Sequence, residues 1–194
     1  MGASPTFMVS FTPFPTLETP RLVLRELVPA DAETIFRIQS NPEVVRYFGR
    51  PAHATLAETE KLLGIVFDAQ RDVTAIRWGL SLEDSGELTG TCGFWRWNKQ
   101  HRYAEIGYEL APAFWGRGLM VEALRPILRY GFTQMELHRV EGIIDPDNHA
   151  SQRVLEKLGF KRDALMRENW FYNGTFTDSA IYGLLEQEFL NEVR

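Results

Sequence analysis

Residues 103–130 read YAEIGYELAPAFWGRGLMVEALRPILRY, and this stretch decides the fold. Its first eight residues alternate between two faces of an extended strand, with Ala104, Ile106, Tyr108 and Leu110 on one face and Tyr103, Glu105, Gly107 and Glu109 on the other. From Leu119 onward, apolar residues recur every three or four positions, as in a helix with one buried face. The stretch therefore predicts a strand bearing carboxylates on one face, then a turn, then a helix.

The turn between them, residues 111–118, carries glycines at 116 and 118 immediately before the helix. Glycine lets the backbone approach a ligand closely. The first N–H groups of a helix have no partner within the helix, and the helix dipole places positive charge there. The turn is thus a candidate site for an anionic phosphate group.

Composition limits the alternatives. The 194 residues, of which 44% are hydrophobic, are most simply one globular domain, and no apolar run approaches the ~20 residues of a membrane helix. No signal peptide is evident and Cys92 is the single cysteine, so we expect a cytoplasmic protein without an internal disulfide. Its net charge of -5, with dispersed basic residues, argues against direct nucleic-acid or membrane binding and mildly favours a cationic partner.

The other elements follow from period and turn signals. Residues 1–18 form an aromatic, proline-bearing arm without a period, and residues 19–194 form the single domain. Strands are predicted at 21–27, 76–82, 88–97, 139–145, 160–167, 170–172 and 175–185. Helices are predicted at 30–39, from the capping-box sequence at Thr55 through Ala69, at 148–158 and at 186–193. This order indicates a mixed α+β chain of the α/β class around one largely antiparallel sheet.

Four blocks together resemble the GNAT superfamily of acetyl-CoA-dependent N-acetyltransferases, and within it the RimJ/RimL-like branch. They are ETPRLVLR at 18–25, EIGYEL at 105–110, WGRGLMVEA at 115–123, and NHAS at 148–151 leading to LGF at 158–160. Their order and spacing span roughly residues 16–185. The resemblance implies a sheet splayed at the acetyl-CoA site, between the strand at 103–110 and the strand that follows Met135.

The resemblance also implies a set of residues that bind acetyl-CoA. The diphosphate would rest on the N–H groups of residues 115–120, and the pantetheine arm would pair with the edge of the splayed strand. The implied binding residues are Leu110, Ala111, Trp115, Gly116, Arg117, Gly118, Leu119, Met120, Asn148 and Ser151. A Gly-x-Gly turn that only starts a helix is the plainer alternative for Gly116 and Gly118.

The chemistry needs a group that removes a proton from the acceptor amine. The resemblance makes Glu105 the first choice for this base, and Glu109, two residues on, the second. A solvated carboxylate on an exposed strand face is the alternative for each. The N–H near Leu110 is the candidate donor to the oxygen of the tetrahedral intermediate.

The leaving thiolate needs stabilisation or a proton. Many family members carry a tyrosine seven residues after the asparagine, but Leu155 stands there, within the apolar stripe of its helix. Ser151 is the nearest hydroxyl and matches a branch in which a serine faces the sulfur. The alternative interpretation of Ser151 is an ordinary serine in the first turn of a helix. The alternative interpretation of Asn148 is a helix N-cap. A thiol pKa of ~8.5 also lets the thiolate leave unprotonated.

Metal or cysteine chemistry is not expected, because the four histidines and Cys92 show no ligand spacing. The expected reaction is acetyl transfer from acetyl-CoA to a primary amine by direct attack, most simply to a protein or peptide N-terminal α-amine. Two alternatives stay open: an enzyme for a small amine such as an antibiotic, polyamine or amino acid, and a non-catalytic acyl-CoA-binding module. A monomer or a homodimer is expected.

Overall fold

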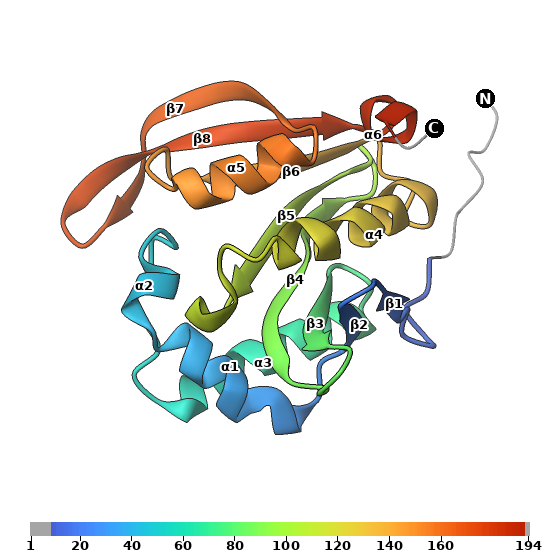
Figure 1. Ribbon diagram of the computed structural model, residues 1–194. Coiled ribbons are helices and arrows are strands. Elements are labelled where there is room, and N and C mark those ends of the chain that lie inside the picture. Colours follow the sequence, from blue (N-terminus) through green and yellow to red (C-terminus); the bar gives the residue numbers. More distant parts are fainter. Residues whose placement is uncertain (1–8, 193–194) are drawn as a thin grey trace.

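The computed structural model describes residues 9–192 and has one central sheet of eight strands in the order β1-β2-β3-β4-β5-β6-β8-β7 (Figure 1). β5 and β6 are parallel, and the other neighbouring strands are antiparallel. The strands are β1 (Leu17–Glu18), β2 (Leu22–Glu26), β3 (Ile76–Leu82), β4 (Leu88–Asn98), β5 (Tyr103–Leu110), β6 (Arg139–Ile144), β7 (Lys161–Tyr172) and β8 (Thr175–Leu185). The mixed, mostly antiparallel fold expected from the sequence is confirmed.

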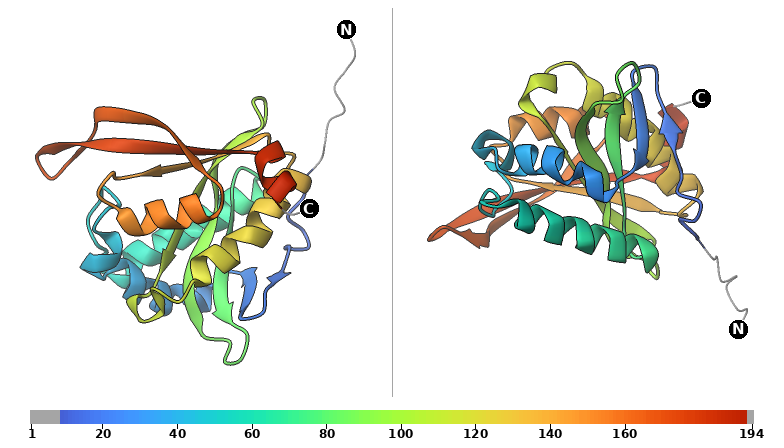
Figure 2. Two further views of the ribbon diagram at one scale, coloured as in Figure 1. Left: turned by 45° about the horizontal axis from the view of Figure 1, so that its top comes forward. Right: turned by 90° about the horizontal axis from the view of Figure 1, so that it is seen from below.

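Helices cover both faces of the sheet (Figure 2). They are α1 (Ala32–Gln39), α2 (Pro42–Val45), α3 (Leu56–Arg71), α4 (Leu119–Thr133), α5 (His149–Lys157) and α6 (Glu186–Glu192). One cluster of buried side chains joins α1 and α3 to the sheet, through residues such as Ile35, Leu63 and Leu88. A larger cluster joins α4 and α5 to the opposite face, through residues such as Leu124, Ile127 and Leu155.

The sheet opens between β5 and β6. These two strands pair only through Tyr103–Glu105 of β5 and Arg139–Glu141 of β6. Beyond residue 105, β5 continues its pairing with β4 as far as Leu110, while β6 continues with β8. The expected splay is therefore present, and it exposes one edge of β5 next to the start of α4.

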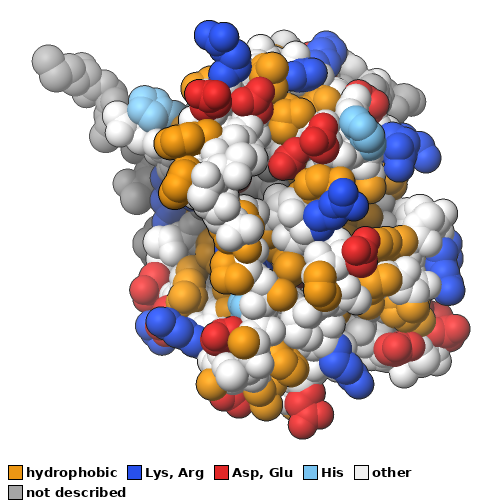
Figure 3. Space-filling view, turned by 90° about the vertical axis from the view of Figure 1, so that its left-hand side faces the viewer, with side chains coloured by type: hydrophobic (Ala, Val, Ile, Leu, Met, Phe, Trp, Pro, Cys, Tyr) orange, Lys and Arg blue, Asp and Glu red, His pale blue; other side chains and the backbone are white. Residues whose placement is uncertain are grey.

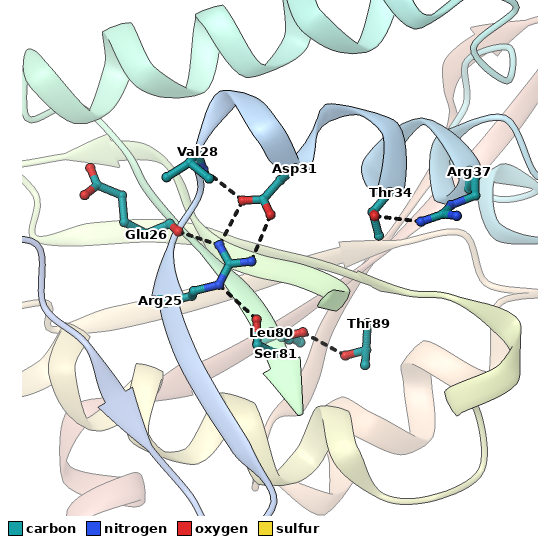
Figure 4. Close-up of polar contacts among 9 residues, drawn as sticks. All are labelled: Arg25, Glu26, Val28, Asp31, Thr34, Arg37, Leu80, Ser81 and Thr89. Atoms are coloured by element: carbon teal, nitrogen blue, oxygen red, sulfur yellow. Dashed lines mark hydrogen bonds and ion pairs between the residues drawn. The ribbon is translucent and has the colours of Figure 1, made fainter. Parts of the chain in front are cut away.

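A partly buried ion pair fixes the turn that leads into α1 (Figure 4). Arg25 on β2 donates two hydrogen bonds of 2.8 Å to the carboxylate of Asp31, which also accepts a bond from the main-chain N–H of Val28. Arg25 further donates to Ser81 on β3. The pair therefore ties the start of α1 to the sheet.

Two local expectations need correction. The segment 30–39 begins as a 3-10 turn, Pro29–Asp31, and only then becomes α1. Asn41-Pro42 ends α1, as expected, but also starts α2, because the Asn41 side chain caps the Glu43 N–H and proline suits a first helical turn. At α3, Thr55 makes no side-chain cap, and Glu58 accepts from Ala54 rather than from Thr55.

The last hairpin projects beyond the body of the molecule (Figure 1). It turns at Asn173-Gly174, both with positive φ, as the two-residue turn predicted from the sequence. Trp170 on β7 donates from its indole to the Gly49 carbonyl at 3.1 Å. A side chain at position 49 would collide with that indole, because a Cβ there would lie 2.1 Å from it. The hairpin therefore holds the backbone next to Arg50.

Residues 9–18 of the predicted N-terminal arm pack on the sheet. Leu17–Glu18 forms β1, Phe11 is buried in the larger cluster, and the Pro15 carbonyl accepts from the Trp78 indole at 2.6 Å. Residues 1–8 of the arm lie outside the described residues. The boundary between arm and domain at residue 18 stays a prediction.

Candidate active site

The glycine turn before α4 presents a run of free main-chain N–H groups. Gly116 and Gly118 have φ values of 73° and 76°, and Gly118 occupies the N-cap position without a side-chain cap. Of the N–H groups expected to bind the diphosphate, that of Trp115 is already used, because it donates to the Pro112 carbonyl at 3.1 Å; within residues 9–192, the N–H groups of residues 116–121 donate no hydrogen bond. A Cβ at Gly116 would meet nothing within 4 Å, so the space beside the turn is open. Free donors, open space and a helix N-terminus together fit a phosphate.

A network on Glu122 holds this turn in place. The Glu122 carboxylate accepts from the Thr19 hydroxyl at 2.7 Å and from the Arg21 side chain at 2.7 Å. Arg21 also donates to the Arg117 carbonyl at 3.1 Å. Although burial opposes the shift, these bonds hold the pKa of Glu122 below its usual range. The sequence block at 18–25 thus supports the turn without entering the cavity beside it.

The turn lines a cavity of about 460 Å³, here called the Gly118 cavity. Of the residues expected to bind acetyl-CoA, most line it: Leu110, Trp115, Gly116, Gly118, Leu119, Met120, Asn148 and Ser151. Ala111 and Arg117 do not, because the Ala111 N–H bonds to Thr89 and the Arg117 guanidinium lies over the Phe114 ring. Three basic side chains also line it: Arg46, Arg153 and Lys157.

The open edge of β5 reaches the same cavity. Residues 107 and 109 face their partners on β4, and the Ala111 N–H donates to the Thr89 carbonyl. Because antiparallel pairs exchange bonds at alternate residues, the main-chain groups of Tyr108 and Leu110 point to the open side. The Leu110 carbonyl accepts from the Trp115 indole at 2.8 Å. The N–H groups of both residues remain directed at the splay.

A second cavity, of about 360 Å³, lies between β5, α1 and α3 and is here called the Arg77 cavity. Its buried polar group is the Glu109 carboxylate, which forms an ion pair with Arg77 and accepts from Thr91. Gln39, at the end of α1, donates to the same carboxylate at 3.0 Å. Three of about four acceptor positions on Glu109 are thereby occupied. One remains for a ligand or a water.

The two cavities meet. Six residues line both of them: Tyr47, Phe48, Tyr108, Glu109, Asn148 and Ser151. At this junction, the Ser151 hydroxyl donates to the Tyr108 hydroxyl at 3.0 Å, and Asn148 caps α5 by accepting from the Ser151 N–H. Burial raises the pKa of Tyr108 to about 12, against which the Ser151 hydrogen bond acts. Tyr108 is therefore a neutral hydroxyl at physiological pH.

Glu105 lies apart from this junction. It is on the part of β5 that is still paired with β6, and it lines neither cavity. Its carboxylate, with a side chain 22% exposed, forms an ion pair with Arg96 at 3.0 Å. The structure thus brings Ser151, Asn148 and the turn together, and it places Glu109 rather than Glu105 beside them.

Sequence reasoning missed several residues of the site. Gln39, Arg77 and Thr91 hold Glu109, but they come from three distant elements, and nothing in their local pattern indicates a shared carboxylate. Tyr108 was placed on a strand face without a role. Its partner, Ser151, is 43 residues away, so the pair becomes visible only once the sheet is known to splay.

The remaining candidates lie outside this chemistry. Cys92 is fully buried on β4, and burial raises its pKa well above the usual range. Among residues 9–192 no cluster of metal-binding side chains occurs. No helix of that part of the chain is long and apolar enough to cross a bilayer. On the face viewed in Figure 3, acidic and basic side chains are interspersed with apolar ones, without a continuous basic surface.

Comparison with known proteins decides the family. A family model described as an acetyltransferase (GNAT) domain matches residues 21–161. The chain belongs to the GNAT acetyltransferases. The matched segment begins at Arg21, which supports the glycine turn, includes the splayed strands and that turn, and ends at the start of β7. An N-acetyltransferase of the GNAT type is therefore shown.

Several relatives of this chain are also named N-acetyltransferases. "Uncharacterized N-acetyltransferase YoaA" of Bacillus subtilis is 37% identical, over 89% of this chain and 98% of its own length. "Putative ribosomal N-acetyltransferase YdaF" of the same species is 30% identical, over 88% of this chain and 94% of its own. Among solved structures, spermidine N-acetyltransferase from Vibrio cholerae in complex with CoA and spermine shares the fold, with a TM-score of 0.79 and 24% identity. The alignment covers 89% of this GNAT chain and the full length of that structure.

Proposed function

We propose that this GNAT enzyme transfers the acetyl group of acetyl-CoA to a primary amine by direct attack at the junction of the two cavities. The carrying observation is the junction itself, where the cavity beside the glycine turn meets the cavity that holds the Glu109 carboxylate. The reaction needs one site for a diphosphate-bearing donor and another for an amine, and they must open onto each other.

The Gly118 cavity is proposed to bind acetyl-CoA. The free N–H groups of residues 116–121 suit the diphosphate, and Arg46, Arg153 and Lys157 suit its charge. The open edge of β5, with the N–H groups of Tyr108 and Leu110, suits the amide groups of the pantetheine arm and the thioester oxygen. The structural neighbour from Vibrio cholerae, which shares this fold, contains CoA.

The Arg77 cavity is proposed to bind the acceptor amine, with Glu109 as the carboxylate that takes its proton, directly or through a water. An α-amine with pKa ~8 is mostly protonated at neutral pH and must lose a proton before it attacks. Glu109 lines both cavities and keeps one acceptor position free, whereas Glu105 lines neither. Glu109 therefore replaces Glu105 as the proposed base, and Glu105 becomes the alternative.

The Ser151–Tyr108 pair is proposed to stabilise the departing sulfur. When the amine nitrogen bonds to the thioester carbon and the carbon–sulfur bond breaks, negative charge develops on sulfur. The Ser151 hydroxyl donates to the Tyr108 hydroxyl at 3.0 Å, so the Tyr108 O–H is the proton that can be donated to the sulfur, with Ser151 supporting it. Since a thiol has a pKa of ~8.5, the sulfur can also leave as a thiolate, so this contribution is smaller than that of the base.

A protein or peptide N-terminal α-amine is the proposed acceptor, as for the ribosomal N-acetyltransferase named among the relatives. The charge of the Arg77 cavity separates this from the polyamine alternative. Its charged lining residues are Arg50, Arg77 and Glu109, so positive charge exceeds negative. A polyamine with several ammonium groups would meet net repulsion there, whereas a monovalent α-amine needs only the one carboxylate.

The test follows release of free thiol from acetyl-CoA with a panel of acceptors: peptides with a free N-terminus, the same peptides with a blocked N-terminus and a lysine, and small amines including spermine. We expect kcat/KM to be highest for the free N-termini. Strong preference for a small amine would move the assignment to that class. CoA binding without turnover of any amine would favour the non-catalytic module.

The role of Glu109 is tested in the same assay by a matched pair of variants. We expect Glu109→Gln to lower kcat/KM by about 100-fold or more, as loss of a general base does, and Glu105→Gln to lower it by less than about 3-fold. Because Glu109 is buried with Arg77, the thermal unfolding of both variants should be measured alongside. A folded Glu109→Gln variant with unchanged activity would remove Glu109 from the mechanism.

A further inference from the structure

Arg50 is a cation in the Arg77 cavity whose charge is left unmatched. It follows α2 and lines this cavity but not the Gly118 cavity. Its guanidinium donates to the Pro51 carbonyl at 3.1 Å and to the side-chain oxygen of Gln39, and it lies 5.4 Å from the centre of the Phe48 ring. Within residues 9–192, Arg50 forms no ion pair with a carboxylate.

The nearby Glu109 carboxylate does not form an ion pair with Arg50. Glu109 is in ion-pair contact with Arg77, and Gln39 stands between Glu109 and Arg50. The Gln39 amide donates to Glu109 through its nitrogen and accepts from Arg50 through its oxygen. A single amide group therefore separates a carboxylate at one end from a guanidinium at the other, and both face the same cavity.

Arg50 is partly buried, and a partly desolvated guanidinium without an ion pair is stabilised when a ligand brings an anion to it. The loss of water around Arg50 lowers its pKa; the charge of Glu109 opposes this shift, and the positive charge of Arg77 adds to it. The loop is also built to hold it: the preceding residue, Gly49, has a φ of 62° and accepts a hydrogen bond from the Trp170 indole. Arg50 is thus held at the cavity wall from both sides.

We propose that the acceptor is an amine that also carries a carboxylate, with its ammonium group on Glu109 and its carboxylate on Arg50. This inference rests on the proposed function and narrows its substrate class. The spacing suits it, because one amide separates the two protein charges, and an amino acid likewise places amine and carboxylate a few bonds apart. Guanidinium pairs with carboxylate through parallel hydrogen bonds, which gives geometric selectivity.

Two sources supply this chemistry: the acidic side chain of a residue at or next to a protein N-terminus, and the α-carboxylate of a free amino acid. Matched acceptors distinguish them. One arm compares peptides beginning Ser-Asp with peptides beginning Ser-Asn. The other compares free amino acids with their amides. In each pair only the carboxylate is replaced by a neutral amide of nearly the same shape.

The experiment measures kcat/KM for each pair with the wild-type protein, Arg50→Gln, Arg50→Lys and the control Arg37→Gln, an exposed arginine of α1 that lines neither cavity. In at least one arm we expect the wild type to prefer the carboxylate by about 10- to 100-fold, the range for a charge-assisted hydrogen bond. The ratio should fall to about 1 in Arg50→Gln, recover in part in Arg50→Lys, and stay at the wild-type value in Arg37→Gln.

The outcomes separate this inference from the proposed function. Amines that are acetylated without any carboxylate preference would overturn the inference and leave the acetyltransferase assignment standing. A preference that persists in Arg50→Gln would also overturn it, because another group would then read the carboxylate. Failure of every amine to be acetylated would overturn both. If Arg50→Gln does not fold, Arg50→Lys decides: a carboxylate preference as large as that of the wild type, rather than an intermediate one, overturns the proposal.

Discussion

At the scale of single residues, many members of the family carry a tyrosine on this helix, seven residues after the asparagine. In this protein the hydroxyls at the junction are those of Tyr108 and Ser151. Leu155 occupies that helix position and is fully buried in the core. A tyrosine from β5 instead reaches Ser151 from across the splay, at 3.0 Å. In the proposed mechanism the strand thus supplies the hydroxyl that acts on the sulfur, and the raised pKa of Tyr108 keeps that hydroxyl protonated.

This gives a test of the leaving-group role. We expect Tyr108→Phe to lower kcat by about 10-fold and to leave the KM for acetyl-CoA within about 2-fold, because the hydroxyl acts on charge that develops only during the reaction. Tyr103→Phe, on the same strand but outside both cavities, is the matched control. Steady-state rates at saturating acceptor decide it, and an unchanged kcat in Tyr108→Phe would show that the hydroxyl contributes nothing.

The two glutamates of β5 show how far residue patterns reach. Alternation places Glu105 and Glu109 on one face of the strand, and both predictions of position are correct. Alternation does not predict where β5 and β6 separate. That point depends on how β5 pairs with a strand about 35 residues downstream. Glu105 lies before that point and Glu109 after it. Which of them meets a ligand is therefore a property of the sheet.

At the scale of elements, the glycine turn and α4 work because β2 and its lead-in hold them. Thr19 and Arg21 bond to Glu122, and Arg21 reaches the Arg117 carbonyl. The conformation of the turn is thus set from outside the turn. This explains why two sequence blocks about a hundred residues apart are joined at the glycine turn.

The lowered pKa of Glu122 has a consequence for stability. A carboxylate whose pKa is lower in the folded state stabilises the fold above its unfolded value of ~4.3, and that contribution is lost as pH falls through the folded pKa. We expect Glu122→Gln to lower the free energy of unfolding by about 1–3 kcal/mol at pH 7, as for hydrogen bonds to a charged group. The difference from wild type should shrink below about pH 4.

Urea denaturation at pH 7 and at about pH 3.5 measures this difference directly. Glu60→Gln, an exposed position of α3, serves as the control and should change stability by less than about 0.5 kcal/mol at either pH. A Glu122→Gln variant with the same deficit at both values would mean that the side chain acts through packing, not through its charge.

Elements with a strong hydrophobic period could be predicted from the sequence, and short elements could not. The strand, turn and helix at 103–133 have the predicted type and nearly the predicted bounds. α2 has four residues, too few for a period, and its first residue is a proline that reads equally as a stop. Yet α2 and the loop after it supply Arg46, Tyr47, Phe48 and Arg50 to the two cavities. The missed helix and its loop therefore contribute to both cavities, α2 through Glu43 and Val44 to the Gly118 cavity and the loop through Arg50 to the Arg77 cavity.

At the scale of the whole molecule, the splay lets two separately built cavities share an opening. The Gly118 cavity is built by α4, α5 and the glycine turn, and the Arg77 cavity by α1, α3 and the sheet. They meet where β5 has left β6, at Tyr108 and Glu109, and along the loop after α2, at Tyr47 and Phe48. The fold class, the order of elements and the glycine turn were accessible from sequence. The pairing of cavities was not, because it depends on contacts between distant segments.

The central claim is that acetyl-CoA binds along the open edge of β5 with its diphosphate on the turn before α4. A crystal structure of the protein with CoA tests this most directly. We expect diphosphate oxygens within about 3.2 Å of main-chain nitrogens of residues 116–121, and the sulfur at the junction beside Ser151 and Glu109. CoA bound elsewhere, or a diphosphate that makes no contact with those nitrogens, would contradict the account.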